Sequence, residues 1–162
     1  MRLVNGSWYL PGQSKFDATC QHAYHRLTKN TQHFDISKCV DPDSDLPITM
    51  PSAEIFSEHM QALGIGRHDQ IICYDHLGMF SVARVHFMLR YFGATNVRIM
   101  NGGFTKWLKE ERPFYSGPYT AGQGLPTDGD YSYEVLDSSK LTSDISKIHS
   151  IAGQLHNGSK DW

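Results

Sequence analysis

The chain has 162 residues, of which 40% are hydrophobic and 20% charged, and its formal net charge is −2. These values are typical of a soluble globular protein with a core of its own. The slight negative charge, with no basic run, excludes nucleic acid as an expected partner, and no apolar run approaches the ~20 residues that a membrane-spanning helix needs.

The first fifty residues predict two short strands, separated by a turn and a helix. Residues 2–6 form an apolar start, and the Pro-Gly pair that follows marks a turn. Residues 16–27 favour a helix, and residues 34–36 indicate a brief second strand. Residues 41–51 combine aspartates with prolines, which predicts a loop.

The middle of the chain alternates helices and strands. Ser52 is the expected N-cap of a helix with an apolar stripe. Residues 70–74 are too few for a helix and predict a buried parallel strand. Helical spacing returns over 82–92, a strand is expected over 97–100, and a helix over 104–108 follows. This order predicts an α/β fold with a central parallel sheet flanked by helices.

The last part of the chain predicts an arm joined to the first domain by a linker. Residues 116–130 are rich in glycine and proline, which favours a linker. Residues 131–136 predict a strand, and apolar positions over 141–155 predict an amphipathic helix. The expected division is a domain over 1–115, a linker over 116–130 and a C-terminal arm over 131–162.

The loop after the strand at 70–74 is the candidate functional site. In open α/β sheets, ligands bind at the carboxyl ends of strands, where backbone N–H groups of a loop bind an anion or activate a thiol. This loop begins with Asp75, whose carboxylate cannot act as the sulfur nucleophile that a thiol would supply there. Asp75 is either a general base or cation ligand, or an acceptor that bonds the amides of its own loop. We favour the acceptor role.

The three cysteines are Cys20, Cys39 and Cys73, and their sparse, odd number does not predict a disulfide framework but a reducing compartment. Cys73 lies two residues before Asp75 and is expected to be a buried, inert thiol. Cys39 follows Lys38 in a predicted loop and is the candidate for a more reactive thiol. The histidines show no metal-site spacing, so we expect neither a metal nor another cofactor.

Several short motifs occur in one order within residues 3 to 120. They are SWYLPG at 7–12, FDI at 34–36, LGMFS at 77–81, RYFG at 90–93 and NGGF at 101–104. Together they resemble the N-terminal rhodanese-like domain of the two-domain thiosulfate and 3-mercaptopyruvate sulfurtransferases.

The resemblance implies a rhodanese-like fold without its nucleophile. In that family the persulfide-forming cysteine belongs to the C-terminal domain, and the loop of the N-terminal domain begins with an aspartate, where Asp75 stands here. Residues 131–162 resemble the start of the second domain and end before any cysteine loop, which suggests a remnant. The resemblance therefore implies no catalytic residue and a degenerate, inactive protein that serves as a structural or accessory subunit of a larger assembly.

The resemblance also implies a partner-binding face and a location. The residues expected at the former interdomain cleft are Trp8, Asp75, His76, Gly78, Phe80 and Arg84. Apolar groups left uncovered there usually mark a partner surface, so we expect a protein partner on this face and on the helix at 141–155. That helix folding back on its own domain is the alternative. The family suggests a mitochondrial location, although no cleavable presequence is visible, and the alternative is the cytoplasm.

Three other functions remain as hypotheses. The first is an active sulfurtransferase that uses Cys73, Cys20 or Cys39 in place of the standard cysteine. The second is a phosphatase-like relative, whose longer loop needs a cysteine and an arginine that residues 75–81 lack. The third is a sensor that binds a cation through Asp75 and His76.

Overall fold

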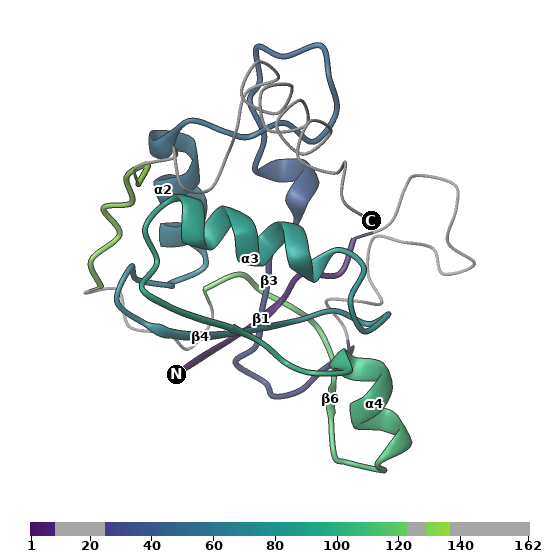
Figure 1. The fold of residues 1–162 in the computed structure, drawn as a ribbon. Coiled ribbons are helices and arrows are strands. Elements are labelled where there is room, and N and C mark those ends of the chain that lie inside the picture. Colours follow the sequence, from purple (N-terminus) through teal and green to yellow (C-terminus); the bar gives the residue numbers. More distant parts are fainter. Residues whose placement is uncertain (9–24, 123–128, 137–162) are drawn as a thin grey trace, which may run out of the picture.

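The computed structural model describes residues 1–8, 25–122 and 129–136, and its centre is a four-stranded sheet (Figure 1). The strand order is β3-β1-β4-β5 and all three pairings are parallel. The strands are β1 (Arg2–Asn5), β3 (Gln32–His33), β4 (Gln70–Tyr74) and β5 (Asn96–Ile99). The predicted α/β architecture with a parallel sheet is confirmed, and β5 begins and ends one residue earlier than expected.

Side chains alternate between the two faces of the sheet and divide the interior into two clusters. Val4 and Cys73 belong to the larger cluster, which includes residues of α2 (Ala53–Ala62) and α3 (Val82–Tyr91). Tyr74 belongs to a smaller cluster with residues of α4 (Gly103–Lys109). Figure 1 shows α3 crossing in front of the sheet, and α4 lying beside β6.

Helix α2 begins where the sequence predicts. The Oγ of Ser52 accepts a hydrogen bond from the N–H of Ile55 at 3.3 Å, which satisfies one of the unpaired amides of the first turn. Phe56 of this helix stacks on Phe92 at the end of α3, with ring centroids 4.3 Å apart. The stacked pair joins the two helices within the larger cluster.

The strand predicted at 34–36 is wrong, because Asp35 caps a helical turn instead. Its Oδ1 accepts hydrogen bonds from the N–H and the Oγ of Ser37, at 3.0 and 2.6 Å, and begins the 3-10 helix η1 (Ile36–Lys38). The strand β3 ends before it, at His33. Local capping by an aspartate has outweighed the apolar residues on either side of it.

The helix predicted at 16–27 is wrong at its end, and the rest of it lies outside the described residues. His25 and Arg26 form the strand β2 (His25–Arg26), which pairs antiparallel with β6 (Tyr115–Ser116). The guanidinium of Arg26 lies over the rings of Tyr115 and Tyr119, 4.9 and 5.4 Å from their centroids. This pairing places residues 115 and 116 beside residues 25 and 26.

The strand predicted at 131–136 does not form, and residues 129–136, here called the strap, run alongside α2 instead (Figure 1). The N–H of Arg67 donates to the carbonyl of Asp130 at 2.8 Å. The N–H of Tyr133 donates to Ser57 Oγ at 3.1 Å, and its hydroxyl donates to the carbonyl of Ile65 at 2.9 Å. These bonds give backbone groups of the strap hydrogen-bond partners in the first domain, in place of the partners that a neighbouring strand would supply. The helix predicted at 141–155 lies outside the described residues.

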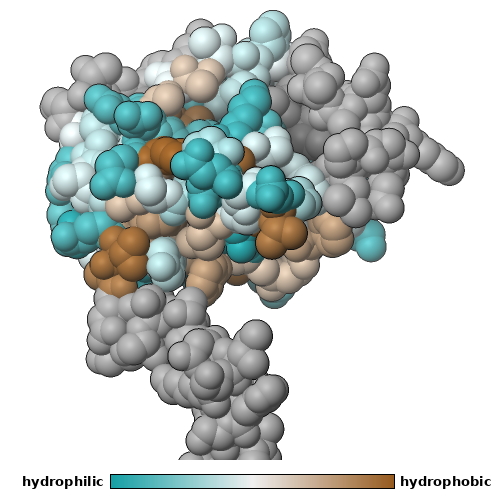
Figure 2. Space-filling view, turned by 90° about the horizontal axis from the view of Figure 1, so that it is seen from above, coloured by the Kyte–Doolittle hydropathy of each residue, from teal (hydrophilic) through white to brown (hydrophobic). Residues whose placement is uncertain are grey.

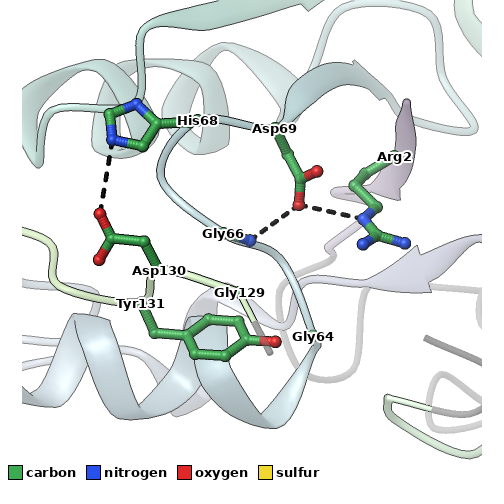
Figure 3. Close-up of a pocket in the computed structure, with 8 residues that line it drawn as sticks. All are labelled: Arg2, Gly64, Gly66, His68, Asp69, Gly129, Asp130 and Tyr131. Atoms are coloured by element: carbon green, nitrogen blue, oxygen red, sulfur yellow. Dashed lines mark hydrogen bonds and ion pairs between the residues drawn. The ribbon is translucent and has the colours of Figure 1, made fainter. Parts of the chain in front are cut away.

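The start of the strap closes one side of a pocket of about 250 Å³. Figure 3 shows the carboxylate of Asp130 facing His68, with 3.4 Å between the paired atoms. Across the pocket, Asp69 accepts hydrogen bonds from Arg2 Nε at 3.0 Å and from the N–H of Gly66 at 2.9 Å. The polar groups of this pocket therefore bond one another and fasten the strap beside the start of the sheet.

Tyr133 is the expected anchor of the strap, because it is 5% exposed and meets Phe56 edge-on at 5.1 Å. Tyr133→Ala should lower the free energy of unfolding by about 3 to 5 kcal/mol, since it leaves a cavity. Tyr133→Phe should cost about 1 kcal/mol, the net worth of one hydrogen bond. Urea unfolding measures both. The exposed Val135→Ala is the control and should stay within about 0.5 kcal/mol. Equal midpoints for Tyr133→Ala and the original chain would contradict this packing.

Candidate functional site

The carboxylate of Asp75 occupies the centre of the loop between β4 and α3, and the residue is 1% exposed. Its Oδ1 accepts a hydrogen bond from the N–H of Gly78 at 2.5 Å. Its Oδ2 accepts from the N–H groups of Phe80, Ser81 and Val82, at 2.6, 2.9 and 3.1 Å. The acceptor role predicted for Asp75 is therefore what the geometry shows. The amides that would bind an external anion already bind this side chain.

Asp75 also replaces the usual cap of α3. Ser81 stands at the N-cap position, but its side chain makes no capping bond. Its Oγ instead donates to the carbonyl of Gly6 at 2.6 Å and accepts from the N–H of Trp8 at 3.1 Å. The negative carboxylate of Asp75 lies at the positive end of the helix, where it is favourable. Ser81 is thereby free to fasten the segment that follows β1.

The loop is held against α4 by an approach that only glycine permits. The N–H of Phe104 donates to the carbonyl of Asp75 at 2.8 Å. Gly103 has φ +55, and a Cβ built on it would lie 2.5 Å from the carbonyl oxygen of Asp75 and 2.9 Å from the Cα of Gly78. A larger residue at 103 would push the two segments apart. The loop at 75–81 is thus fixed by backbone contacts from two sides.

His76 turns into a polar cluster rather than into an open cleft. Its backbone N–H donates to Ser7 Oγ at 2.9 Å, and its imidazole ring stacks on the ring of Phe104 with centroids 4.3 Å apart. Its Nε2 lies 3.3 Å from Asn5 Nδ2 and 3.1 Å from the carbonyl of His25. A ring engaged on these sides is positioned to hold the ends of β1, β2 and β4 together.

The sequence did not reveal the other members of this cluster. Asn5 Oδ1 accepts hydrogen bonds from the N–H and the Oγ of Ser7, at 3.1 and 2.6 Å. His33 Nε2 lies 3.0 Å from the carbonyl of Ser7. Burial lowers the pKa of His33, more than its bond to that carbonyl raises it. The available signal was that Asn5 and His33 each end a short strand, since the ends of parallel strands share one edge.

Both described cysteines are buried thiols. Cys73 is 0% exposed in β4, and burial raises its pKa to about 12. Cys39 is also 0% exposed, and burial raises its pKa to about 12 although Arg84 opposes this shift. Cys39 follows η1 (Ile36–Lys38) as its C-cap residue, and its side chain belongs to the larger hydrophobic cluster, which does not favour the reactivity expected of it. Cys20 lies outside the described residues.

The predicted cleft residues separate into exposed and internal groups. Phe80 is 57% exposed, and its neighbours Leu77 and Met79 are 56% and 61% exposed. Trp8 is only partly exposed and packs against the larger cluster. Arg84 is partly buried and its Nη2 donates to the carbonyl of Ile48 at 3.0 Å, and burial lowers its pKa.

Leu77, Met79 and Phe80 are called the apolar tip of the loop. Single exposed hydrophobic side chains are common on protein surfaces, but three large ones on one short loop are not isolated and need an explanation. On the face of the molecule that Figure 2 shows, hydrophilic residues are interspersed with small separate areas of hydrophobic ones.

The geometry does not favour a cation at Asp75 and His76. Both carboxylate oxygens of Asp75 face N–H donors, which repel a positive ion. Within residues 1–8, 25–122 and 129–136, no group of three or more His, Cys, Asp and Glu is placed to hold a metal ion. In the same residues, no helix has the length and hydrophobicity needed to cross a membrane.

Comparison with known proteins places these features in a family context. Residues 17–110 match the Rhodanese-like domain family. The thiosulfate sulfurtransferase of Cricetulus griseus is 36% identical over 120 residues, which are 73% of this chain and 39% of that protein. The 3-mercaptopyruvate sulfurtransferase of Homo sapiens is 34% identical over 119 residues, 72% of this chain and 39% of that protein. The matched part of the chain thus spans about two fifths of these curated relatives.

Solved structures share the fold. SseA of Escherichia coli, from work on 3-mercaptopyruvate sulfotransferases, matches with a TM-score of 0.78 and 24% identity, over 94% of this chain and 55% of that one. The sub-stoichiometric sulfur transferase subunit of yeast mitochondrial complex I matches with a TM-score of 0.68 and 23% identity, over 94% and 52%. These likenesses agree with the parallel sheet and flanking helices described above.

Asp75→Ala should destabilise the fold and open an anion site. Loss of a charged acceptor that bonds four amides should lower the free energy of unfolding by about 3 kcal/mol. The vacated amides should then bind sulfate, which raises the melting temperature of the variant by mass action but not that of the original chain. Thermal unfolding with and without sulfate, compared at equal ionic strength in chloride, measures this.

The exposed loop residue Asp45 supplies the matched control. Asp45→Ala removes the same charge and should change stability by less than about 0.5 kcal/mol, with no specific response to sulfate. If sulfate stabilises all three proteins equally, the amides around Asp75 are not an anion site.

Proposed function

Since the chain belongs to the rhodanese-like domain family, we propose that it forms a non-catalytic protein-binding domain and acts as an accessory subunit of a larger assembly. The observation that carries the proposal is the carboxylate of Asp75, which fills the ring of amides at the candidate site. Sulfur transfer through a covalent intermediate needs a thiolate within reach of such donors. Here the position holds an acceptor that cannot form a persulfide.

The two described thiols support the same proposal. Cys39 and Cys73 are enclosed in the hydrophobic core, and burial raises the pKa of each to about 12. At neutral pH both are therefore protonated, and no donor molecule can reach them without local unfolding. Neither side chain meets the requirement of exposure and low pKa that reactive cysteines share.

The protein-binding part of the proposal rests on the apolar tip formed by Leu77, Met79 and Phe80. The tip is exposed, yet its loop is fixed by the bonds of Asp75 and by the close approach of Gly103. A rigid apolar projection loses little conformational entropy on binding, which favours a protein partner. Gly78, His76 and Asp75 support the tip from within, and Trp8 lies beside them through its bond to Ser81.

The domain division is part of the proposal. We place a rhodanese-like domain over 1–115, followed by the linker at 116–130 and an arm over 131–162. The contacts of Tyr133 with Ser57 and Ile65 show that the start of this arm packs against the proposed first domain.

The assembly and its location are also proposals. One solved protein of this fold is a sulfur transferase subunit of yeast mitochondrial complex I, so this fold occurs in a subunit of a larger mitochondrial assembly. At 23% identity this likeness concerns the fold alone. A mitochondrial location is proposed from the family, and the cytoplasm is the alternative.

The second candidate function is sulfur transfer from thiosulfate or 3-mercaptopyruvate. The sequence identity to two named sulfurtransferases favours it. Within this chain it would need Cys20, since the other two thiols are enclosed. The nucleophile would then stand outside the loop at 75–81, and the amides around Asp75 would take no part.

A cyanolysis assay separates the two functions. The full chain should release no thiocyanate above the blank with thiosulfate or 3-mercaptopyruvate as donor, because no described thiol ionises at neutral pH. Cys20→Ser and Cys73→Ser should behave like the original chain, and a full-length thiosulfate sulfurtransferase is the positive control. Thiocyanate release that disappears in Cys20→Ser would refute the non-catalytic function.

Photo-crosslinking tests the partner face. A photoreactive phenylalanine analogue at Phe80, in cells that naturally express the protein, should give a covalent adduct with one other polypeptide, because that side chain would lie in the interface. The same analogue at Leu46, which is 70% exposed in the loop at 41–51, is the control and should give none. Equal adducts at both positions, or none at Phe80, would argue against a partner at the apolar tip.

A further inference from the structure

A groove of about 480 Å³ lies beside the apolar tip, between the loop at 75–81 and the beginning of α4. One wall carries the exposed side chains of Leu77 and Met79. The other wall comes from the turn before α4 and from the first turns of that helix. The residues that line the groove are Leu77, Gly78, Met79, Asn101, Gly102, Thr105, Lys106 and Lys109.

The two walls are fixed relative to each other. Thr105 Oγ1 donates to the carbonyl of His76 at 2.5 Å, which ties the first turn of α4 to the loop. Gly78 lies against Gly102, whose carbonyl oxygen would be 3.4 Å from a Cβ at 78. The groove is therefore formed before any partner arrives, and a ligand would not have to order it.

The charge of the groove has one sign. Lys106 and Lys109 line it, and no Asp or Glu does. Lys106 meets Glu110 at 3.9 Å, but both side chains are exposed, and such a pair contributes little. Lys109 makes no ion pair with any residue in the described part of the chain. Two ammonium groups thus stand beside an apolar wall, and neither has a strong ion-pair partner among the described residues.

We propose that this groove binds an acidic segment of a partner protein, with an apolar side chain against Leu77 and Met79 and carboxylates at Lys106 and Lys109. This inference rests on the proposed protein-binding function and names the chemistry of the partner. A free inorganic anion would leave the apolar wall uncovered. An anionic membrane surface is a weaker fit, because lipid-binding patches usually gather about four to eight basic residues.

Fluorescence anisotropy with the full chain tests the proposal. The probe is a short labelled peptide in which leucines alternate with acidic residues. It should bind, and added salt should weaken the binding because the contact is partly ionic. Lys109→Glu should weaken it about tenfold or more, since a like charge then faces the peptide. Leu77→Ser should weaken it by about tenfold through loss of apolar burial.

Matched controls make the outcome decisive. Lys29→Glu makes the same charge change at an exposed residue outside the groove and should leave binding unchanged. Lys109→Arg should retain binding. Each altered residue is exposed, so thermal unfolding should show an intact fold. The proposal fails if the probe does not bind, if Lys29→Glu weakens it as much as Lys109→Glu, or if a peptide with serine for leucine binds as well. Binding to phosphatidylserine vesicles that the peptide does not displace would also overturn it.

The result is independent of the test of the proposed function. If the peptide fails to bind while no sulfur transfer occurs and the Phe80 adduct forms, then only the chemistry assigned to the groove is wrong. If thiocyanate is released, the non-catalytic function is wrong, whatever the peptide does.

Discussion

The carboxylate of Asp75 is the interaction on which the rest of the described structure depends. It accepts hydrogen bonds from four backbone amides and takes the place of the cap of α3. The carbonyl of the same residue accepts from Phe104 at the start of α4. One residue therefore joins the central strand, the loop and both following helices. Because these bonds use up the amides at the carboxyl end of β4, they also decide what the site can bind.

The sequence predicted the elements whose signal is local. The strand β4 follows from a short apolar run, and α2 follows from Ser52 and the apolar stripe behind it. The role of Asp75 could be predicted because an aspartate at the start of a strand–loop–helix turn has amides within its own loop to bond. The burial of Cys73 could be predicted too, since side chains alternate along a strand and Cys73 lies in an inner strand of the sheet.

The failures have two physical causes. Asp35 began a 3-10 turn where apolar neighbours had indicated a strand, so a local cap outweighed composition. The other failures came from contacts between distant residues. Tyr133 is anchored by Ser57 and Ile65, and Cys39 is buried by elements elsewhere in the chain. The cluster around His76 likewise depends on the parallel pairing of β1 with β4, which a single sequence does not specify.

The double role of Asp75 has a consequence for how such a domain evolves. A cysteine at this position would supply a sulfur atom, but it would withdraw the oxygens that hold the start of α3 and would leave its amides partly unsatisfied. The gain of chemistry and the loss of structure would arrive in the same step. A functional cysteine at position 75 would therefore require compensating changes that supply new acceptors to the amides of the loop and of the first turn of α3.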